Sequence, residues 1–187
     1  MKQPIRIAVI GGGFMGKAHC NAWHRVGEFF DTAYQPVLQV LAGNQSNLDD
    51  FAGRWGFGEI SYDWRSVVAR NDIDVVDICT PTDTHHDIAI AAAQAGKHVI
   101  CEKPFTLSSA DARAMLTAVQ KAGVVHYLNH NYRRVPAVAL AKKLIADGRL
   151  GRIYHWRGAY FQDWLTDPDF PRTWQLQRKR AGGGPLF

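Results

Sequence analysis

Short apolar runs alternate with amphipathic segments along the first two thirds of the chain. The runs are nearly continuous in apolar character, which is the pattern of strands that are buried on both faces of a parallel sheet. They cover residues 5–10, 37–42, 75–79, 98–101 and 124–128. Because segments with apolar positions at helical spacing separate them, the chain predicts an α/β fold with a doubly wound parallel sheet.

The first helical segment, about residues 15–30, follows the first strand directly. Ala18, Ala22, Val26 and Phe29 recur at helical spacing within it. We expect this stripe to be the face that packs on the sheet.

Three glycines at the spacing G-x-G-x-x-G join the first strand to this helix. Gly11 allows a sharp turn, Gly13 lets the backbone approach a pyrophosphate, and Gly16 lets the helix lie close to the strand. Phe14 and Met15 begin the helix, whose N–H groups and dipole attract an anion. The pattern predicts a dinucleotide site; the alternative is a glycine-rich turn without a ligand, which would not need all three positions.

The turn after the second strand bears on the choice of cofactor. In a dinucleotide fold this turn meets the adenosine ribose, and a carboxylate there favours NAD over NADP. The chain has Asn44 and Ser46 instead, which can hydrogen-bond either ribose. Asn44 and Asn47 can alternatively just begin the next helix. The preference between NAD and NADP is therefore left open.

Polar residues also follow the strand at 75–79, at the edge where open α/β sheets bind their ligands. Thr80 and Pro81 are expected to flank the cofactor. For His85 the pattern leaves two alternatives, a place on the cofactor side or a first-turn helical residue that faces solvent.

Lys103 lies between Glu102 and Pro104 at the end of the strand 98–101. When an alcohol is oxidised by hydride transfer, the hydroxyl proton leaves and the developing alkoxide must be stabilised. An ammonium group within hydrogen-bonding reach can stabilise that oxygen, and a desolvated lysine can take part in proton transfer. The alternative is an ordinary surface lysine in a loop.

The segment after the last strand changes in character. Asn131, Tyr132 and Arg133 can bind a hydroxylated substrate, or can hold their own loop together by hydrogen bonds. Residues 153–161 are aromatic and β-prone, and we expect them to form the first strand of a second sheet. Residues 163–174 are rich in Asp, Pro and aromatic residues, which suits either a lid over a sugar-like ligand or a structural excursion.

These changes divide the chain into two parts. Residues 1–128 are expected to form a dinucleotide-binding domain. Residues 129–187 are expected to supply a connecting helix and the incomplete beginning of a second, open-sheet α/β domain. Because one strand cannot make a sheet, we expect the 187 residues to be the N-terminal portion of a longer protein.

Composition narrows the classes of partner. The formal net charge is +5, but the basic residues are scattered apart from those at 178–180, so we expect an anionic cofactor and no nucleic acid. Cys20, Cys79 and Cys101 are odd in number and form no C-x-x-C motif, which indicates a reducing compartment and no metal site. Since no apolar run reaches the ~20 residues of a membrane span, we expect a cytoplasmic protein without membrane contact.

The motifs taken together resemble the Gfo/Idh/MocA family of oxidoreductases, which includes glucose–fructose oxidoreductase and inositol 2-dehydrogenase. They are the three glycines near the N-terminus, T-P-x-x-x-H at 80–85, E-K-P at 102–104 and N-Y-R-R at 131–134. The resemblance implies a Rossmann domain followed by an open α/β domain whose sheet often forms a dimer interface, and hence a homo-oligomer at full length. It implies NAD or NADP as cofactor, and a secondary alcohol of a sugar, inositol or related polyhydroxylated compound as substrate.

The resemblance also implies roles for individual residues. Lys103 would be the catalytic lysine near the nicotinamide. The cofactor side would comprise Gly11, Gly13, Phe14, Met15, Gly16, Asn44, Thr80, Pro81, His85, Glu102 and Lys103. The substrate side would comprise Tyr132, Arg133, Trp164 and Trp174. The family's general-base histidine belongs to a D-x-x-x-H motif that would fall after residue 187, so a non-catalytic dinucleotide-binding protein or sensor is the alternative.

Overall fold

The computed structural model describes residues 2–44, 46–163 and 166–182. It divides into two units, Met1–Asn129 with Trp174–Phe187, and His130–Thr173. The first unit contains the whole sheet and most of the helices.

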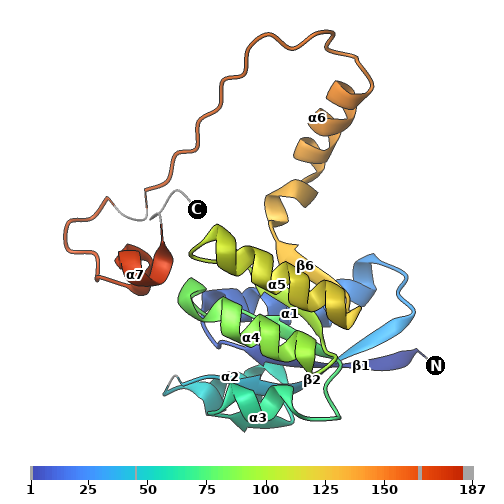
Figure 1. The fold of residues 1–187 in the computed structure, drawn as a ribbon, viewed down its shortest axis with the longest axis vertical. Coiled ribbons are helices and arrows are strands. Elements are labelled where there is room, and N and C mark those ends of the chain that lie inside the picture. Colours follow the sequence, from blue (N-terminus) through green and yellow to red (C-terminus); the bar gives the residue numbers. More distant parts are fainter. Residues whose placement is uncertain (1, 45, 164–165, 183–187) are drawn as a thin grey trace. The chain divides into compact units, whose positions relative to one another are not determined.

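A parallel sheet forms the centre of the first unit, as the sequence predicts, and it has six strands (Figure 1). Its strands are β1 (Gln3–Ile10), β2 (Tyr34–Ala42), β3 (Glu59–Ser61), β4 (Val75–Ile78), β5 (His98–Glu102) and β6 (His126–Asn129). The order across the sheet is β3-β2-β1-β4-β5-β6. The sequence pattern missed β3, because three residues are too few to show a period.

Helices cover the sheet on two faces. They are α1 (Phe14–Phe29), α2 (Leu48–Trp55), α3 (Trp64–Val68), α4 (His85–Gln94) and α5 (Ser109–Ala122). Alternate residues of β1 point to opposite faces. Ile7 and Val9 pack with α1 and α2, whereas Ala8 and Ile10 pack with α3, α4 and α5. Figure 1 shows α4 and α5 side by side on their face.

The buried face of α1 differs from the predicted stripe. Phe29 is 66% exposed, and Ala18 and Ala22 are exposed as well, whereas His19 and Cys20 are buried. The helix turns toward the sheet the face that carries Gly16, and residues three and four positions later share that face. The close approach at Gly16 therefore buries a histidine that apolar periodicity assigns to the solvent side.

The order of strands reverses direction at β1, which lies between β2 and β4. This is the topological switch point at which open α/β sheets bind ligands. The Gly11 N–H donates to the Ala42 carbonyl at 2.8 Å, and the Cys79 N–H donates to the Ile10 carbonyl at 2.8 Å. The turns after β1 and β4 are thus fixed to neighbouring strands.

The second unit contains the short 3-10 helix η2 (Asn131–Arg134) and helix α6 (Pro136–Ala146). The strand predicted over residues 153–161 is not formed: these residues are exposed and have no regular structure. A strand is stable only where a neighbour pairs its backbone groups. No described residue of this unit belongs to a strand, so the β-prone segment has no partner there.

The end of the chain returns to the first unit as η3 (Trp174–Leu176) and α7 (Arg178–Ala181). Nε of Arg180 lies 3.0 Å from the carboxylate of Asp83, in the short 3-10 helix η1 (Thr82–Thr84) after β4. None of the described helices is both long and apolar enough to cross a membrane.

Candidate functional site

The three glycines of the turn after β1 differ in the space available for a side chain. Gly11 has φ of +110°, and a Cβ there would lie 2.7 Å from the Cys79 carbonyl group. A Cβ on Gly16 would overlap the carbonyl oxygen of Gly11. A Cβ on Gly13, by contrast, would meet nothing within 4 Å. The fold itself therefore requires glycine at 11 and 16, whereas at 13 the missing side chain leaves open space above the backbone.

The N-terminus of α1 opens onto the same space. Gly13 is the N-cap residue, its position offers no side-chain cap, and the first turn contains no acidic residue. The N–H groups of the first turn and the positive end of the helix dipole are thus available to an anion. Phe14 is 81% exposed at this end, while Met15 is half-buried against the core beneath it. These features fit the diphosphate of a dinucleotide.

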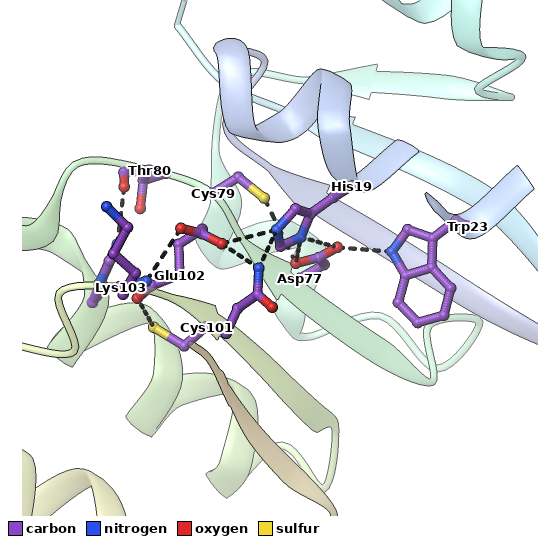
Figure 2. Close-up of polar contacts among 10 residues, drawn as sticks. His19, Trp23, Asp77, Cys79, Thr80, Cys101, Glu102 and Lys103 are labelled. Atoms are coloured by element: carbon purple, nitrogen blue, oxygen red, sulfur yellow. Dashed lines mark hydrogen bonds and ion pairs between the residues drawn. The ribbon is translucent and has the colours of Figure 1, made fainter. Parts of the chain in front are cut away.

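Lys103 lies at the carboxyl end of β5, on the edge of the sheet that carries the glycine turn, and its side chain is exposed. The preceding Glu102 is only 3% exposed, and its carboxylate is directed into the protein. Figure 2 shows Lys103 and Thr80 at one end of a row of polar side chains that runs to Trp23. Thr80 Oγ1 accepts a hydrogen bond from Thr84 Oγ1 at 2.7 Å.

His85 is completely buried, so the alternative of a solvent-facing residue is wrong. Its Nε2 lies 2.9 Å from the carbonyl oxygen of Thr80, and its Nδ1 lies 3.0 Å from that of Pro104. The imidazole therefore ties the turn after β4 to the loop that carries Lys103. The chain needs a polar ring here because both loops turn carbonyl oxygens inward.

Behind this edge lies a buried polar network that sequence reasoning missed (Figure 2). His19 Nδ1 is 2.8 Å from one carboxylate oxygen of Asp77, and His19 Nε2 is 3.0 Å from Oε1 of Glu102. Trp23 Nε1 donates to Asp77 at 2.7 Å, and Asn129 Nδ2 donates to Glu102 Oε1. The signal in the sequence is Asp77 itself, because a carboxylate inside an apolar strand needs a buried partner.

The network places one cation between two carboxylates. Burial alone lowers the pKa of His19, but its hydrogen bonds to Asp77 and Glu102 outweigh burial and raise that pKa to about 10. Burial raises the pKa of Glu102, and the hydrogen bonds from His19 and Asn129 lower it by more. His19 is therefore an imidazolium and Glu102 a carboxylate at neutral pH.

His19, Asp77 and Cys79 also have the composition of a metal site, with ligand atoms within 4.8 Å of one another. The imidazole nitrogens, however, both face carboxylate oxygens. The Cys79 thiol donates to the same Asp77 carboxylate, with its Sγ 3.6 Å from Oδ1, and burial raises the pKa of this thiol. The described contacts of His19, Asp77 and Cys79 are therefore those of an internal network of hydrogen bonds and ion pairs.

The stability of the protein should depend on pH through His19. Its pKa is 6.5 when exposed and about 10 when folded, so its stabilising contribution is complete below pH 6.5 and is lost as pH rises to 10. We expect the free energy of unfolding of the wild type to exceed that of His19→Gln by about 3–5 kcal/mol at pH 7, and the difference to shrink by pH 10. Urea unfolding at both pH values measures it; a constant difference would contradict the charge assignment.

The remaining predicted residues lie in several places. Asn44 is exposed after β2, and Asn47 is the N-cap of α2 without a side-chain cap bond. Tyr132 and Arg133 are exposed in the second unit, where the Tyr132 hydroxyl lies 2.8 Å from that of Tyr160. Trp174 is half-buried in η3 of the first unit. Trp164 lies outside the described residues. The substrate roles of Tyr132, Arg133, Trp164 and Trp174 remain predictions.

Comparison with known proteins assigns both parts of the chain to one family. The sequence profile described as "Oxidoreductase family, NAD-binding Rossmann fold" matches residues 5–130, and the family's C-terminal-domain profile matches residues 138–187. Levoglucosan dehydrogenase of Pseudarthrobacter phenanthrenivorans is 48% identical over 98% of this chain and 48% of its own length. Inositol 2-dehydrogenase of Rhizobium meliloti is 33% identical over 80% of this chain and 43% of its own.

Solved structures agree with these sequence matches. A levoglucosan dehydrogenase in complex with NADH and levoglucosan superimposes with a TM-score of 0.93, at 48% identity, over 98% of this chain and 50% of that one. An oxidoreductase domain protein from Kribbella flavida gives 0.93 at 45% identity, over 100% of this chain and 50% of that one. The chain thus spans about half the length of the relatives it matches. Residues 5–130 of the chain form an NAD-binding Rossmann domain. The chain belongs to the Gfo/Idh/MocA family of oxidoreductases.

Proposed function

We propose that the protein containing this chain is an NAD-dependent dehydrogenase that oxidises a secondary alcohol of a sugar. The observation that carries the proposal is the division among the three glycines. Gly11 and Gly16 are required by the fold, but nothing in the described part of the protein excludes a side chain at Gly13. A ligand that must approach the backbone at this point explains why glycine is present there.

Each part of the described site has a definite task in such a reaction. The first-turn N–H groups of α1 bind the diphosphate, and the turn at Thr80 and Pro81 borders the cofactor. A nicotinamide held at this edge would supply the hydride acceptor. Lys103 stabilises the negative charge that develops on the substrate oxygen as its proton passes to the general base, which the family resemblance places in the D-x-x-x-H motif. The buried carboxylate of Glu102 accepts a hydrogen bond from the backbone N–H of Lys103 and so holds the backbone that carries the lysine.

The similarity to the relatives supports the choice of substrate class in this proposal. Levoglucosan dehydrogenase is similar over 98% of this chain, at 48% identity. We therefore favour an anhydrosugar such as levoglucosan, or a related pyranose, over an inositol. Tyr132, Arg133, Trp164 and Trp174 are the candidate substrate contacts. Aromatic and guanidinium side chains suit a polyhydroxylated ring, which presents apolar C–H faces and hydroxyl edges.

NAD is the preferred cofactor in this proposal. A relative with 48% identity has been solved with NADH, and the turn after β2 offers no arginine for a ribose phosphate. Asn44 is exposed there and can hydrogen-bond ribose hydroxyls. The ratio of kcat/KM for NAD⁺ to that for NADP⁺ tests this preference, and a ratio below one would reverse it.

An assay of the full-length protein tests the function. NAD⁺ reduction at 340 nm is expected with levoglucosan or a related sugar and at lower kcat/KM with inositols. NADH binding without turnover on any sugar, anhydrosugar or inositol would instead favour a dinucleotide-binding sensor. The full-length protein is further expected to be cytoplasmic and to self-associate through its second domain. Size-exclusion chromatography with light scattering measures its oligomeric state.

A further inference from the structure

Buried His19 connects three parts of the site that are far apart in the sequence. It lies on α1, three residues after Gly16, and contacts Asp77 of β4 and Glu102 of β5. We propose that His19 is a positioning residue, which holds Glu102 and, through it, the backbone of Lys103 in the orientation that the reaction needs. The proposal rests on the dehydrogenase function proposed above.

The carboxylate of Glu102 forms the link from His19 to the lysine. Its Oε1 accepts hydrogen bonds from His19 Nε2, at 3.0 Å, and from Asn129 Nδ2. Its Oε2 accepts the backbone N–H of Lys103 at 3.3 Å. The carboxylate cannot rotate without breaking bonds at both oxygens. The orientation of the Glu102–Lys103 peptide is therefore set by donors on α1 and β6.

The imidazole of His19 is itself held in one orientation. Its Nδ1 lies 2.8 and 3.0 Å from the two carboxylate oxygens of Asp77, which is completely buried in β4. Trp23, one turn further along α1, donates to the same carboxylate at 2.7 Å. Two side chains of α1 thus bind the buried carboxylate of Asp77. The ring can turn only if this second ion pair also breaks.

The position of His19 on α1 gives the network its significance. The same helix presents its N-terminus to the diphosphate site at Gly13. The helix that binds the cofactor and the loop that carries Lys103 therefore share one internal support. A displacement of about 1 Å between reacting groups can reduce a rate by about 100-fold. The His19 network can therefore set the distance between the cofactor and Lys103 without contacting the cofactor or the substrate.

Glutamine is the informative replacement for His19, because it retains a hydrogen-bond donor but carries no charge. His24→Gln is the matched control, since His24 lies on the exposed side of α1 and contacts the Trp55 carbonyl. Hydrogen exchange of the peptide covering residues 102–106 reports on the Lys103 amide without any need for activity. In His19→Gln we expect hydrogen exchange of the Lys103 amide to accelerate by about tenfold or more, while exchange in β1 and β2 stays unchanged.

Kinetics of the full-length protein provide the second readout. His19→Gln is expected to lower kcat by about 10- to 100-fold while the Kd for NADH changes less than about threefold. His24→Gln is expected to change neither. Faster exchange over the whole first unit would mean that His19 has a general structural role and would overturn the proposal. Equal decreases in kcat and in NADH affinity would overturn it in the same way.

Glu102→Gln keeps the test decisive if His19→Gln does not fold. A glutamine has one acceptor oxygen, so it cannot satisfy both the His19–Asn129 pair and the Lys103 N–H. We expect the same local acceleration of exchange at Lys103. Where both single variants fold, their double variant should lose no more than about threefold beyond the worse of the two. Independent, multiplicative losses would overturn the proposal. If no variant or wild type turns over any sugar, the dehydrogenase function fails while the exchange result still decides the role of His19.

Discussion

Replacing Lys103 with methionine is expected to lower kcat for NAD-dependent sugar oxidation by about 1,000-fold in the full-length protein. Methionine has a similar length and removes only the charge and the proton-transfer capacity. Lys103 is exposed at the edge of the sheet where the glycine turn lies, and its side chain has no ion-pair partner among the described residues. Its ammonium is thus available to a substrate oxygen.

The same variant should leave NADH affinity within about threefold, because the diphosphate is bound at the other side of the site by backbone groups. Lys121→Met is the matched control: this lysine is exposed in the last turn of α5 and should be dispensable. Stopped-flow measurement of the hydride-transfer step separates chemistry from product release. Unchanged turnover in Lys103→Met would remove the lysine from the mechanism.

Gly16→Ala is expected to destabilise the first unit by about 3 kcal/mol or more, because the added Cβ would overlap the Gly11 carbonyl oxygen. The clash involves backbone on both sides, so neither element can yield without moving α1 away from β1. Gly13→Ala adds the same methyl group into open space, at φ of −78°. Its cost should be about 1 kcal/mol or less, from the poorer N-cap.

Urea unfolding of the two variants beside the wild type measures this difference. The comparison is matched, since both changes add one methyl group within three residues of each other. If Gly13→Ala proves as destabilising as Gly16→Ala, the fold alone would account for all three glycines, and the argument for a ligand at Gly13 would lose its support.

Much of the first unit follows from local sequence. The apolar runs specify five of the six strands, and the glycines between the first strand and α1 specify the turn. Placement of Thr80 and Lys103 at one edge also follows, because parallel strands end on the same side of a sheet. These features depend on residues close together in the chain, where spacing carries the information.

The buried network could not be derived in this way. Asp77 and Glu102 lie 58 and 83 positions after His19, and only the strand order brings the three residues together. Apolar periodicity assigned the wrong face to α1, since it does not allow for a charged residue that is stabilised by buried partners. The aromatic segment at 153–161 failed for a related reason: β-propensity does not supply the neighbouring strand that pairing requires.

Titration of NADH fluorescence against Gly13→Glu and Gly27→Glu is the most direct test of the central claim, that a dinucleotide diphosphate occupies the space above Gly13. Both glycines lie on or beside α1, and neither has an atom within 4 Å of its Cβ position. A carboxylate at 13 should repel the diphosphate and weaken NADH binding by about tenfold or more, while Gly27→Glu binds like the wild type. Equal NADH affinity in the two variants would place the cofactor elsewhere and contradict the account.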